Sequence, residues 1–477
     1  MLKSASILFA GNICLAVFNL IRSILVARLL TVEEFGIAST FNILLAMMTM
    51  AFGLNLGQLL IQAPDGEARR FQGTLQVIQI GMGLTIAGAM VMGAGLYADL
   101  MTVPEAVWGF QLMALLAFSQ GFLHLDVYRQ QRAMRFTPFV LHTTGGVVLS
   151  TLAVYPLYLV FGDWRVMLYT LLIQQLLAFA FSHLTAERSY RLAWDGAVAR
   201  RALLFSAPLL LNGVFLLGIS QGERLIVANR FGLEELAWFS VGFMLTMLPV
   251  SLIAKSLHTL FLPVLSRHQG DPAAFGLTAI VACQAVLVLG LALALGFALF
   301  GPAVIWFLYG ERYMPAAALV VLLAVMQGVR TAQTGTVVAA LARARSGFAL
   351  YITVARFAFI ARARAAVRYG GGDILALVLI GIAGERAALM LAYAILRGPL
   401  GVGLRRLGPA LGVVGAALLA ITWQGGSAPV PAGPWAGLHA GQLVPLGLTL
   451  LVPLAMPALR RALTARLAGR GWAEAAQ

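Results

Sequence analysis

The chain carries the stretch ILVARLLTVEEFGIAS at residues 24–39 and a related stretch, LIVANRFGLEELAWFS, at residues 225–240. Five positions are identical at a constant offset of 201: Val26/Val227, Ala27/Ala228, Glu33/Glu234, Glu34/Glu235 and Ser39/Ser240. Each stretch contains the end of one apolar block and the beginning of the next. The two halves of the chain are therefore predicted to repeat one helical arrangement.

The composition is that of a membrane protein. Of 477 residues, 61% are hydrophobic and 11% are charged, and the mean hydropathy is +0.90; soluble domains have roughly 25% charged residues. Apolar blocks of about 20 residues, the length of a spanning helix, fill the sequence nearly end to end. A soluble enzyme with one anchor is excluded because no hydrophilic stretch is long enough to fold alone, and the short alternating strands of an outer-membrane barrel would give a lower mean hydropathy.

We predict an all-α polytopic membrane protein with about 14 transmembrane helices, bounded by charged or Pro/Gly clusters. The first block is a retained helix, because its apolar run extends to about Leu30 without a signal-peptide cleavage site. Gly301-Pro302 is expected to end or kink the ninth helix. The expected spans are 5–28, 36–62, 74–98, 105–125, 138–161, 165–185, 203–228, 236–260, 275–308, 315–342, 347–361, 373–396, 408–424 and 438–459.

The basic residues predict the orientation. Twenty of the 33 lie in alternate connections on one side of the membrane and seven on the other, so the side with twenty should be cytoplasmic, with both termini inside. One group of basic residues violates this charge pattern: Arg362, Arg364 and Arg368, which follow the short eleventh span. Either their side chains reach to the membrane interface, or the span is misplaced.

The offset of 201 crosses six helices, an even number, so both halves have the same orientation. This predicts two six-helix bundles related by a pseudo-two-fold axis along the membrane normal. The expected organisation is an N-terminal bundle at 1–200, a C-terminal bundle at 201–400, and two extra helices with a basic cytoplasmic tail at 401–477.

Several stretches carry a resemblance to a known family: IRSILVARLLTVEEFGIAS from residue 21, the block from FSAPLLLNGVF at 205 to MLPVSL at 252, FLPVLSR at 261–267 and YGERYMPA at 309–316. They resemble bacterial polysaccharide flippases of the multidrug/oligosaccharidyl-lipid/polysaccharide exporter superfamily. The resemblance extends through about the twelfth helix.

The resemblance implies 12+2 helices in the bacterial inner membrane and a role in exopolysaccharide or lipopolysaccharide biosynthesis. Such proteins move undecaprenyl-pyrophosphate-linked oligosaccharide from the inner to the outer leaflet by alternating access. The implied partners are an anionic polyprenyl-pyrophosphate oligosaccharide and the lipid bilayer, with a polysaccharide polymerase as a further candidate.

Ionisable residues within spans are candidates for the binding site because a charge at bilayer depth costs at least about 2.5–3.5 kcal/mol. A planar guanidinium donates paired hydrogen bonds and so suits a pyrophosphate. Arg22 is the leading candidate: Asn12 and Asn19 share its helix face, and in the run R-x-x-x-x-A-R it resembles a cavity-lining arginine of lipid II flippases. The predicted substrate-binding residues are Arg22, Asn19, Asn12, Glu223, Arg224, Lys255, Arg330 and Arg356.

The repeat places Arg22 and Glu223 at equivalent positions. We hypothesise that they pair in one conformation and that substrate phosphate displaces the glutamate in another. For each in-span charge, a structural ion pair or a side chain reaching the interface is the alternative. Arg356 with Glu385 and Arg386 could equally form a structural network.

Other functions fit the sequence less well. It has no Walker motif, glycine-rich nucleotide fingerprint or metal-ligand spacing, so no catalytic residue, cofactor or metal is predicted. The basic residues punctuate apolar blocks, which argues against nucleic acid. The alternatives are a multidrug/cation antiporter of the same superfamily, a lipid II flippase, and a membrane glycosyltransferase or polymerase.

Specific features weigh against each alternative. Six in-span basic residues against two acidic ones, Glu223 and Glu385, favour an anionic substrate over a cation. Residues 41–51 lack the arginines that lipid II flippases place there, and no connection is long enough for a polymerase's periplasmic loop. Sugar recognition would fall to polar groups such as Gln58, Gln76, Gln174 and Asn212.

Overall fold

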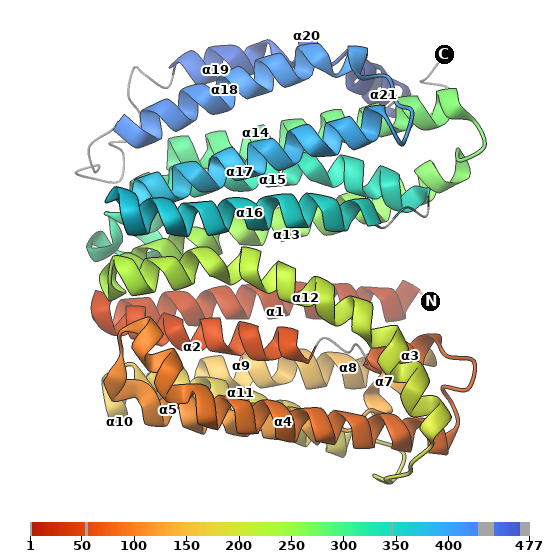
Figure 1. The fold of residues 1–477 in the computed structure, drawn as a ribbon, viewed down its shortest axis with the longest axis vertical. Helices are drawn as coiled ribbons and strands as arrows, with labels where there is room; N and C mark the ends of the chain where they lie inside the picture. The colour runs from red at the N-terminus through yellow and green to blue at the C-terminus, as the bar shows by residue number, and fades with distance from the viewer. Residues whose placement is uncertain (1, 53–55, 344, 346, 428–442, 468–477) are drawn as a thin grey trace. The chain divides into compact units, whose positions relative to one another are not determined.

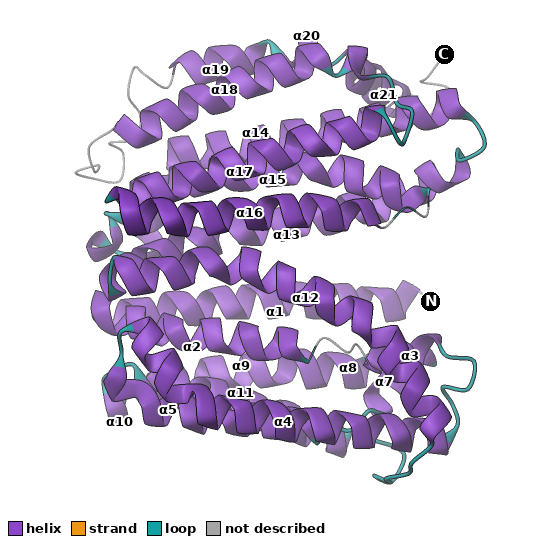
Figure 2. Ribbon diagram, in the orientation of Figure 1, coloured by secondary structure: helices purple, strands orange, loops and turns teal. Residues whose placement is uncertain are grey.

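The computed structural model describes residues 2–52, 56–343, 345, 347–427 and 443–467. These residues form helices joined by short connections, and none of them is in a strand (Figure 2). The prediction of an all-α protein is confirmed. The chain divides into two compact units, here called the N-terminal unit (Met1–Ala237) and the C-terminal unit (Trp238–Gln477).

The N-terminal unit contains long helices and several short, broken ones (Figure 1). Their bounds are α1 Leu2–Leu29, α2 Val32–Ala51, α3 Leu56–Gln62, α4 Arg69–Met101, α5 Val107–Leu112, α6 Ala114–Gly121, α7 Asp126–Arg132, α8 Thr137–Val140, α9 Gly146–Leu152, α10 Val154–Phe161, α11 Arg165–Leu184 and α12 Gly196–Arg230.

The C-terminal unit consists mainly of long helices, beginning within α13. Their bounds are α13 Leu233–Arg267, α14 Pro272–Tyr309, α15 Ala316–Ala342, α16 Gly347–Gly370, α17 Ile374–Arg397, α18 Gly408–Ser427, α19 Leu443–Leu450, α20 Val452–Ala455 and α21 Pro457–Leu467.

Among the described residues, nine helices are long and apolar enough to cross a membrane, or up to eleven if each of two bent pairs is one span. The bent pairs are Pro104–Gly121 with Asp126–Arg132, at 49°, and Thr137–Leu152 with Val154–Phe161, at 44°. The chain is thus a multi-pass membrane protein. The fourteen predicted blocks all contain helices, but α12 and α16, which carry several arginines, are not among the nine.

The helix α14 does not end at Gly301-Pro302 but continues to Tyr309 with Pro302 inside it, and the predicted kink at this point stays a prediction. One predicted span is wrong. The eleventh helix, α16, does not stop near residue 361: it runs to Gly370 and includes Arg362, Arg364 and Arg368. Arg362 and Arg364 are exposed, so their long side chains do not have to end the helix.

The repeat is visible in the helix ends. The helices α1 and α12 end at Leu29 and Arg230, and α2 and α13 begin at Val32 and Leu233, so both boundaries differ by the same 201 residues as the sequence repeat. In the first half, Thr31 and Glu34 form a capping box: the Thr31 hydroxyl accepts from the Glu34 amide at 3.2 Å, and the Glu34 carboxylate accepts from the Thr31 amide at 3.3 Å. Such a box fixes where the helix starts.

A second pair of equivalent features is a close helix crossing in each unit. In the N-terminal unit α4 meets α6 at Gly83 and Gly121; in the C-terminal unit α14 meets α15 at Gly290 and Gly328. A Cβ at Gly83 would lie 2.6 Å from the Gly121 Cα, and one at Gly328 would lie 2.5 Å from the Gly290 carbonyl oxygen. Both glycines of the second pair lie 207 residues after those of the first. Glycine suits such a crossing because small residues let helix backbones approach closely in membranes.

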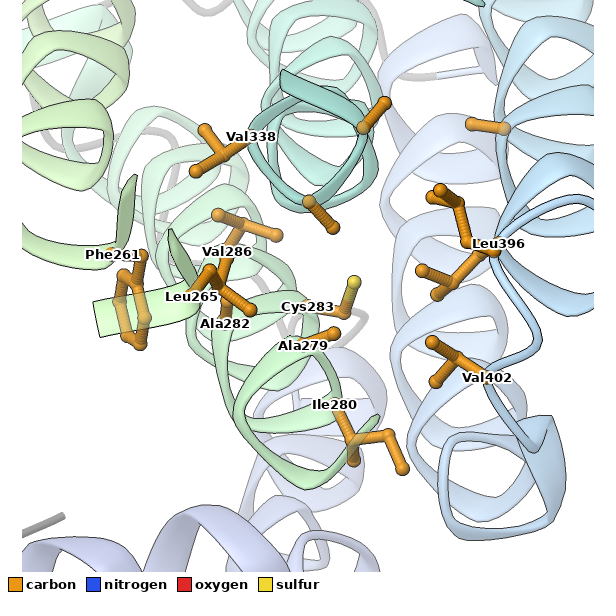
Figure 3. Packing of buried hydrophobic residues seen from close by; sticks show 14 of the residues in the cluster. Phe261, Leu265, Ala279, Ile280, Ala282, Cys283, Val286, Val338, Leu396 and Val402 are labelled. Atoms are coloured by element: carbon orange, nitrogen blue, oxygen red, sulfur yellow. The ribbon is translucent and has the colours of Figure 1, made fainter. Parts of the chain in front are cut away.

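The core of the C-terminal unit surrounds α14 and α15. Figure 3 shows Phe261 and Leu265 on α13, Cys283 on α14 and Leu396 on α17 within this apolar cluster. The candidate span of α15 is 89% buried inside the structure, so a polar side chain on α15 needs a partner within the protein.

The compact units divide after Ala237, whereas the sequence analysis places the boundary at residue 200. The difference is α12, which packs against α2 and α4 of the N-terminal unit. The two-bundle symmetry expected from the repeat remains a prediction.

Candidate functional site

The N-terminal unit holds a polar cluster around Arg22 in α1. Arg22 is only 5% exposed. Its guanidinium donates to the Asn19 side-chain oxygen at 2.7 Å and to the Gln174 side-chain oxygen on α11. The structure thus joins Arg22 and Asn19, as their spacing predicted, and adds Gln174 from 152 residues away.

Hydrogen bonds to the neighbouring helices hold α1 in place. The Thr144 hydroxyl donates to the Gly11 carbonyl at 3.3 Å, and the Thr151 hydroxyl donates to the Phe18 carbonyl at 3.5 Å. Asn19 donates its amide to the Leu15 carbonyl at 2.8 Å, which leaves its oxygen for Arg22. The guanidinium is therefore held by a side chain that is itself anchored.

The partners of Arg22 are neutral amides. A guanidinium has five N–H donors, and two of them are engaged by described residues. The remaining donors are available to an anion, which would bind through charge-assisted hydrogen bonds. Chemically, the cluster is a buried cation suited to a phosphate oxygen.

Three further candidates, Asn12, Glu223 and Arg224, lie in the N-terminal unit. Asn12 is exposed and donates to the Leu8 carbonyl at 3.0 Å. Glu223 is 6% exposed, and Arg224 donates to the Gln221 side-chain oxygen at 3.2 Å. In this structure Arg22 bonds to Asn19 and Gln174, and its pairing with Glu223 stays a prediction.

The C-terminal unit holds a second polar cluster, centred on Glu385 in α17. Glu385 is 4% exposed. Its carboxylate accepts from Arg330 on α15, at 2.7 and 2.9 Å, and from Arg356 on α16, at 2.9 Å. Gln333 donates to the second carboxylate oxygen at 2.8 Å. The two arginines and one glutamate carry a net positive charge.

The structure joins Arg356 and Glu385, two members of the network that the sequence analysis kept as an alternative, and adds Arg330, which was not predicted to belong to it. Arg386 is not part of it: its guanidinium donates to the Thr422 hydroxyl on α18 at 3.4 Å. Gln333 was missed, although its spacing of three residues from Arg330 places it on the same helix face.

The remaining candidates are scattered. Lys255 is exposed on α13, and Gln58 is exposed on α3. Gln76 donates to the Leu123 carbonyl at 2.7 Å. The Asn212 side chain lies outside what the structure describes.

Solved structures of membrane transporters share this fold. An inward-facing multidrug resistance transporter of the MATE family, in the MOP superfamily, has a TM-score of 0.67 at 16% identity over 81% of this chain and 94% of its own. The lipid II flippase MurJ, in an inward closed conformation, has a TM-score of 0.68 at 12% identity over 98% of this chain and 100% of its own. An outward-facing MATE structure has a TM-score of 0.57 at 15% identity over 82% and 93%.

A comparison with curated protein sequences finds no match. A family model described as "Polysaccharide biosynthesis protein" matches residues 25–318, more than half of the chain. This match includes the first copy of the repeat almost entirely, all of the second, and the helices α2 to α14. The chain therefore belongs to the polysaccharide biosynthesis protein family and has the fold of the multidrug/oligosaccharidyl-lipid/polysaccharide exporter superfamily.

Proposed function

We propose that this protein is a flippase that moves undecaprenyl-pyrophosphate-linked oligosaccharide from the inner to the outer leaflet of the bacterial cytoplasmic membrane. The observation that carries the proposal is Arg22, a buried guanidinium whose described partners are neutral amides. A cation in this setting attracts a phosphate because the partners described for it carry no compensating charge. Membership of a polysaccharide biosynthesis family supports an oligosaccharide as the cargo.

In this proposal the two clusters have different roles. Arg22 binds the pyrophosphate directly, with Asn19 and Gln174 orienting its planar fork. The Arg330–Glu385–Arg356 cluster has an excess of one positive charge, and substrate phosphate competes with Glu385 for its arginines. Alternating access then exposes the bound headgroup first to the cytoplasm and later to the periplasm. A polysaccharide polymerase would receive the flipped lipid.

The test is export of the lipid-linked oligosaccharide in a strain lacking the chromosomal gene. Arg22→Gln removes the charge but keeps a side chain of similar size. Arg22→Lys keeps the charge but loses the planar guanidinium and its paired N–H donors. Losing a charge-assisted hydrogen bond costs about 1.5–3 kcal/mol, so we expect Arg22→Gln to slow export roughly ten- to hundredfold. The measurement is the amount of oligosaccharide lipid left on the cytoplasmic face.

Arg267→Gln is the matched control, because it makes the same substitution at an exposed arginine in the last turn of α13 that is not a candidate site residue, and it should export normally. Export by Arg22→Gln at the wild-type rate, with equal protein in the membrane, would remove Arg22 from the site.

A lipid II flippase is the second candidate, since the MurJ structure matches nearly the whole chain. The test is complementation: this gene is expressed in a strain depleted of its own lipid II flippase. Growth of that strain would assign lipid II as the substrate instead of an oligosaccharide lipid.

A further inference from the structure

The N-terminal unit has a solvent-open cavity that the proposed transport cycle does not use. It is small, with a volume of about 20 Å³, and lies where the start of α4 meets the connection between α11 and α12. None of its lining residues is acidic. Those that matter for its chemistry are Arg69, Gln72, Gln76, His124, Arg188 and Arg191.

Close packing gives the cavity fixed walls. A Cβ at Gly73 would lie 2.9 Å from the Ala193 Cβ and 3.1 Å from the Arg191 carbonyl oxygen, so the connection lies directly on α4. Gln76 fixes the opposite wall, because its amide donates to the Leu123 carbonyl at 2.7 Å and its oxygen accepts from the Leu125 amide at 3.2 Å. The cavity is therefore formed in advance of any ligand.

The charge of the cavity is unbalanced. Arg188 is compensated, since it donates to the Glu67 carboxylate at 3.1 Å and to the Glu67 carbonyl at 2.8 Å. Arg69 and Arg191 are both exposed, and neither is shown in an ion pair with a carboxylate of the described residues. Arg191 donates to the Ser189 hydroxyl at 3.1 Å. Two cations thus face the cavity without a counterion from the described residues, which favours an anionic ligand.

The helix start adds to this positive potential. The first turn of α4 contains Arg69 and Arg70 and no acidic residue, and its N-cap, Ala68, offers no side-chain cap. Arg70 is paired with Asp195 at 3.4 Å, so Arg69 is the arginine that adds to the potential. Cations at the N-terminus of a helix oppose its dipole. A bound anion would compensate both the helix dipole and Arg69.

Apolar side chains beside the cavity indicate that the anion belongs to a lipid. On the connection itself, Leu192 is 57% exposed and Trp194 is 61% exposed; at the end of α11, Leu184 is 80% exposed. Exposed leucine and tryptophan beside arginines are typical of the membrane interface, where tryptophan lies at headgroup depth. Basic pockets between helices on the cytoplasmic side of membranes bind anionic lipid headgroups.

We propose that this cavity binds the phosphate headgroup of an anionic phospholipid from the arginine-rich side of the membrane. Arg69 and Arg191 pair with the phosphate, and Leu192 and Trp194 contact the acyl region. The site is distinct from the Arg22 and Glu385 clusters, so it can be tested without reference to the transported substrate.

The experiment is native mass spectrometry of the purified full-length protein in detergent, titrated with phosphatidylglycerol or phosphatidylcholine. An interfacial arginine contributes about 1 kcal/mol to binding of anionic lipid, so Arg69→Gln/Arg191→Gln should weaken phosphatidylglycerol binding about thirtyfold. Phosphatidylcholine binding should not change. The matched control is Arg405→Gln/Arg406→Gln, which removes two exposed arginines from the same predicted side and should bind phosphatidylglycerol like the wild type.

A second pair of measurements separates a lipid from a free anion. Leu192→Ser/Trp194→Ser should weaken phosphatidylglycerol binding while leaving the arginines in place, and inorganic phosphate should not compete. The proposal is overturned if both double variants bind phosphatidylglycerol normally, if the control loses as much affinity as the arginine variant, or if inorganic phosphate displaces the lipid.

Discussion

Glu385 contacts both Arg330 and Arg356 in the interior of the C-terminal unit. One acidic side chain that is 4% exposed therefore compensates two cations in the interior of the C-terminal unit. A buried ion cluster is strongly destabilised when one partner is removed, because the charges left behind are neither solvated nor paired.

We expect Glu385→Gln to lower the stability of the protein by about 3 kcal/mol, seen as a lower thermal unfolding midpoint in detergent. Glu311→Gln, which changes an exposed glutamate in the same unit, is the control and should unfold like the wild type. Equal midpoints for the wild type and Glu385→Gln would mean that Glu385 does not stabilise the unit.

Glu187, in the connection after α11, is held by two arginines outside the membrane spans. It accepts from Arg135 at 2.6 Å and from Arg129 at 2.9 Å. Hydrogen bonds from Arg135, and then from Arg129, lower the pKa of Glu187 below its ordinary value of 4.5. A lowered carboxyl pKa stabilises the fold above the ordinary value, and this stabilisation is lost as the pH falls through the lowered pKa.

The wild type should therefore lose stability as the pH is lowered from neutral to below 4.5, and Glu187→Gln should lose less over the same range. Thermal midpoints measured across that range test this, with Glu105→Gln, an exposed glutamate of the same unit, as the control. An unchanged slope of midpoint against pH in Glu187→Gln would contradict the prediction.

At the scale of helices, the sequence predicted starts and ends best where local chemistry sets them. Thr31 and Glu34 form the capping box that starts α2 at Val32. The sequence repeat, with its offset of 201 residues, then predicts the start of α13 at Leu233. Pro302 does not end α14, because a proline can remain inside a long helix when neighbouring helices support it. The end of α16 was misjudged because arginines were taken as span boundaries, although Arg362 and Arg364 are exposed along the helix.

The glycine crossings were not predicted, because a close approach depends on two helices meeting and not on either sequence alone. Gly290→Val should destabilise the C-terminal unit by about 1–3 kcal/mol, because its Cβ would overlap the Gly328 backbone. Size-exclusion profiles after a heating series measure this.

Gly296→Val is the control on the same helix, since no heavy atom lies within 4 Å of a Cβ at that position. The equivalent pair in the N-terminal unit, Gly83→Val and Gly88→Val, should behave in the same way. If Gly290→Val is as stable as Gly296→Val, the crossing does not require glycine.

For the whole molecule, composition was sufficient to predict an all-α multi-pass protein, and the family match agrees with the resemblance. The partners within each cluster were harder to predict. Gln174 is 152 residues from Arg22, and Glu385 is 55 residues from Arg330. Such contacts depend on how helices pack, which hydropathy and spacing do not encode.

The charge distribution also predicts the topology. A single cysteine at Ser189, in an arginine-rich connection, should be protected from a membrane-impermeant maleimide in intact cells and labelled after permeabilisation. A cysteine at Glu105, which lies between α4 and α5 at the end of a predicted span on the opposite side, should be labelled in intact cells. Both positions are exposed, and the background would carry Cys14→Ser and Cys283→Ala. The reverse labelling pattern would invert the predicted orientation.

The amide partners of Arg22 have a consequence for energy coupling. A guanidinium stays protonated at every physiological pH, and the side-chain amides of Asn19 and Gln174 do not titrate. The cluster therefore presents the same electrostatic state whether the surrounding compartment is neutral or acidic. If a proton gradient drives the transport cycle, the proton must be taken up and released by other groups.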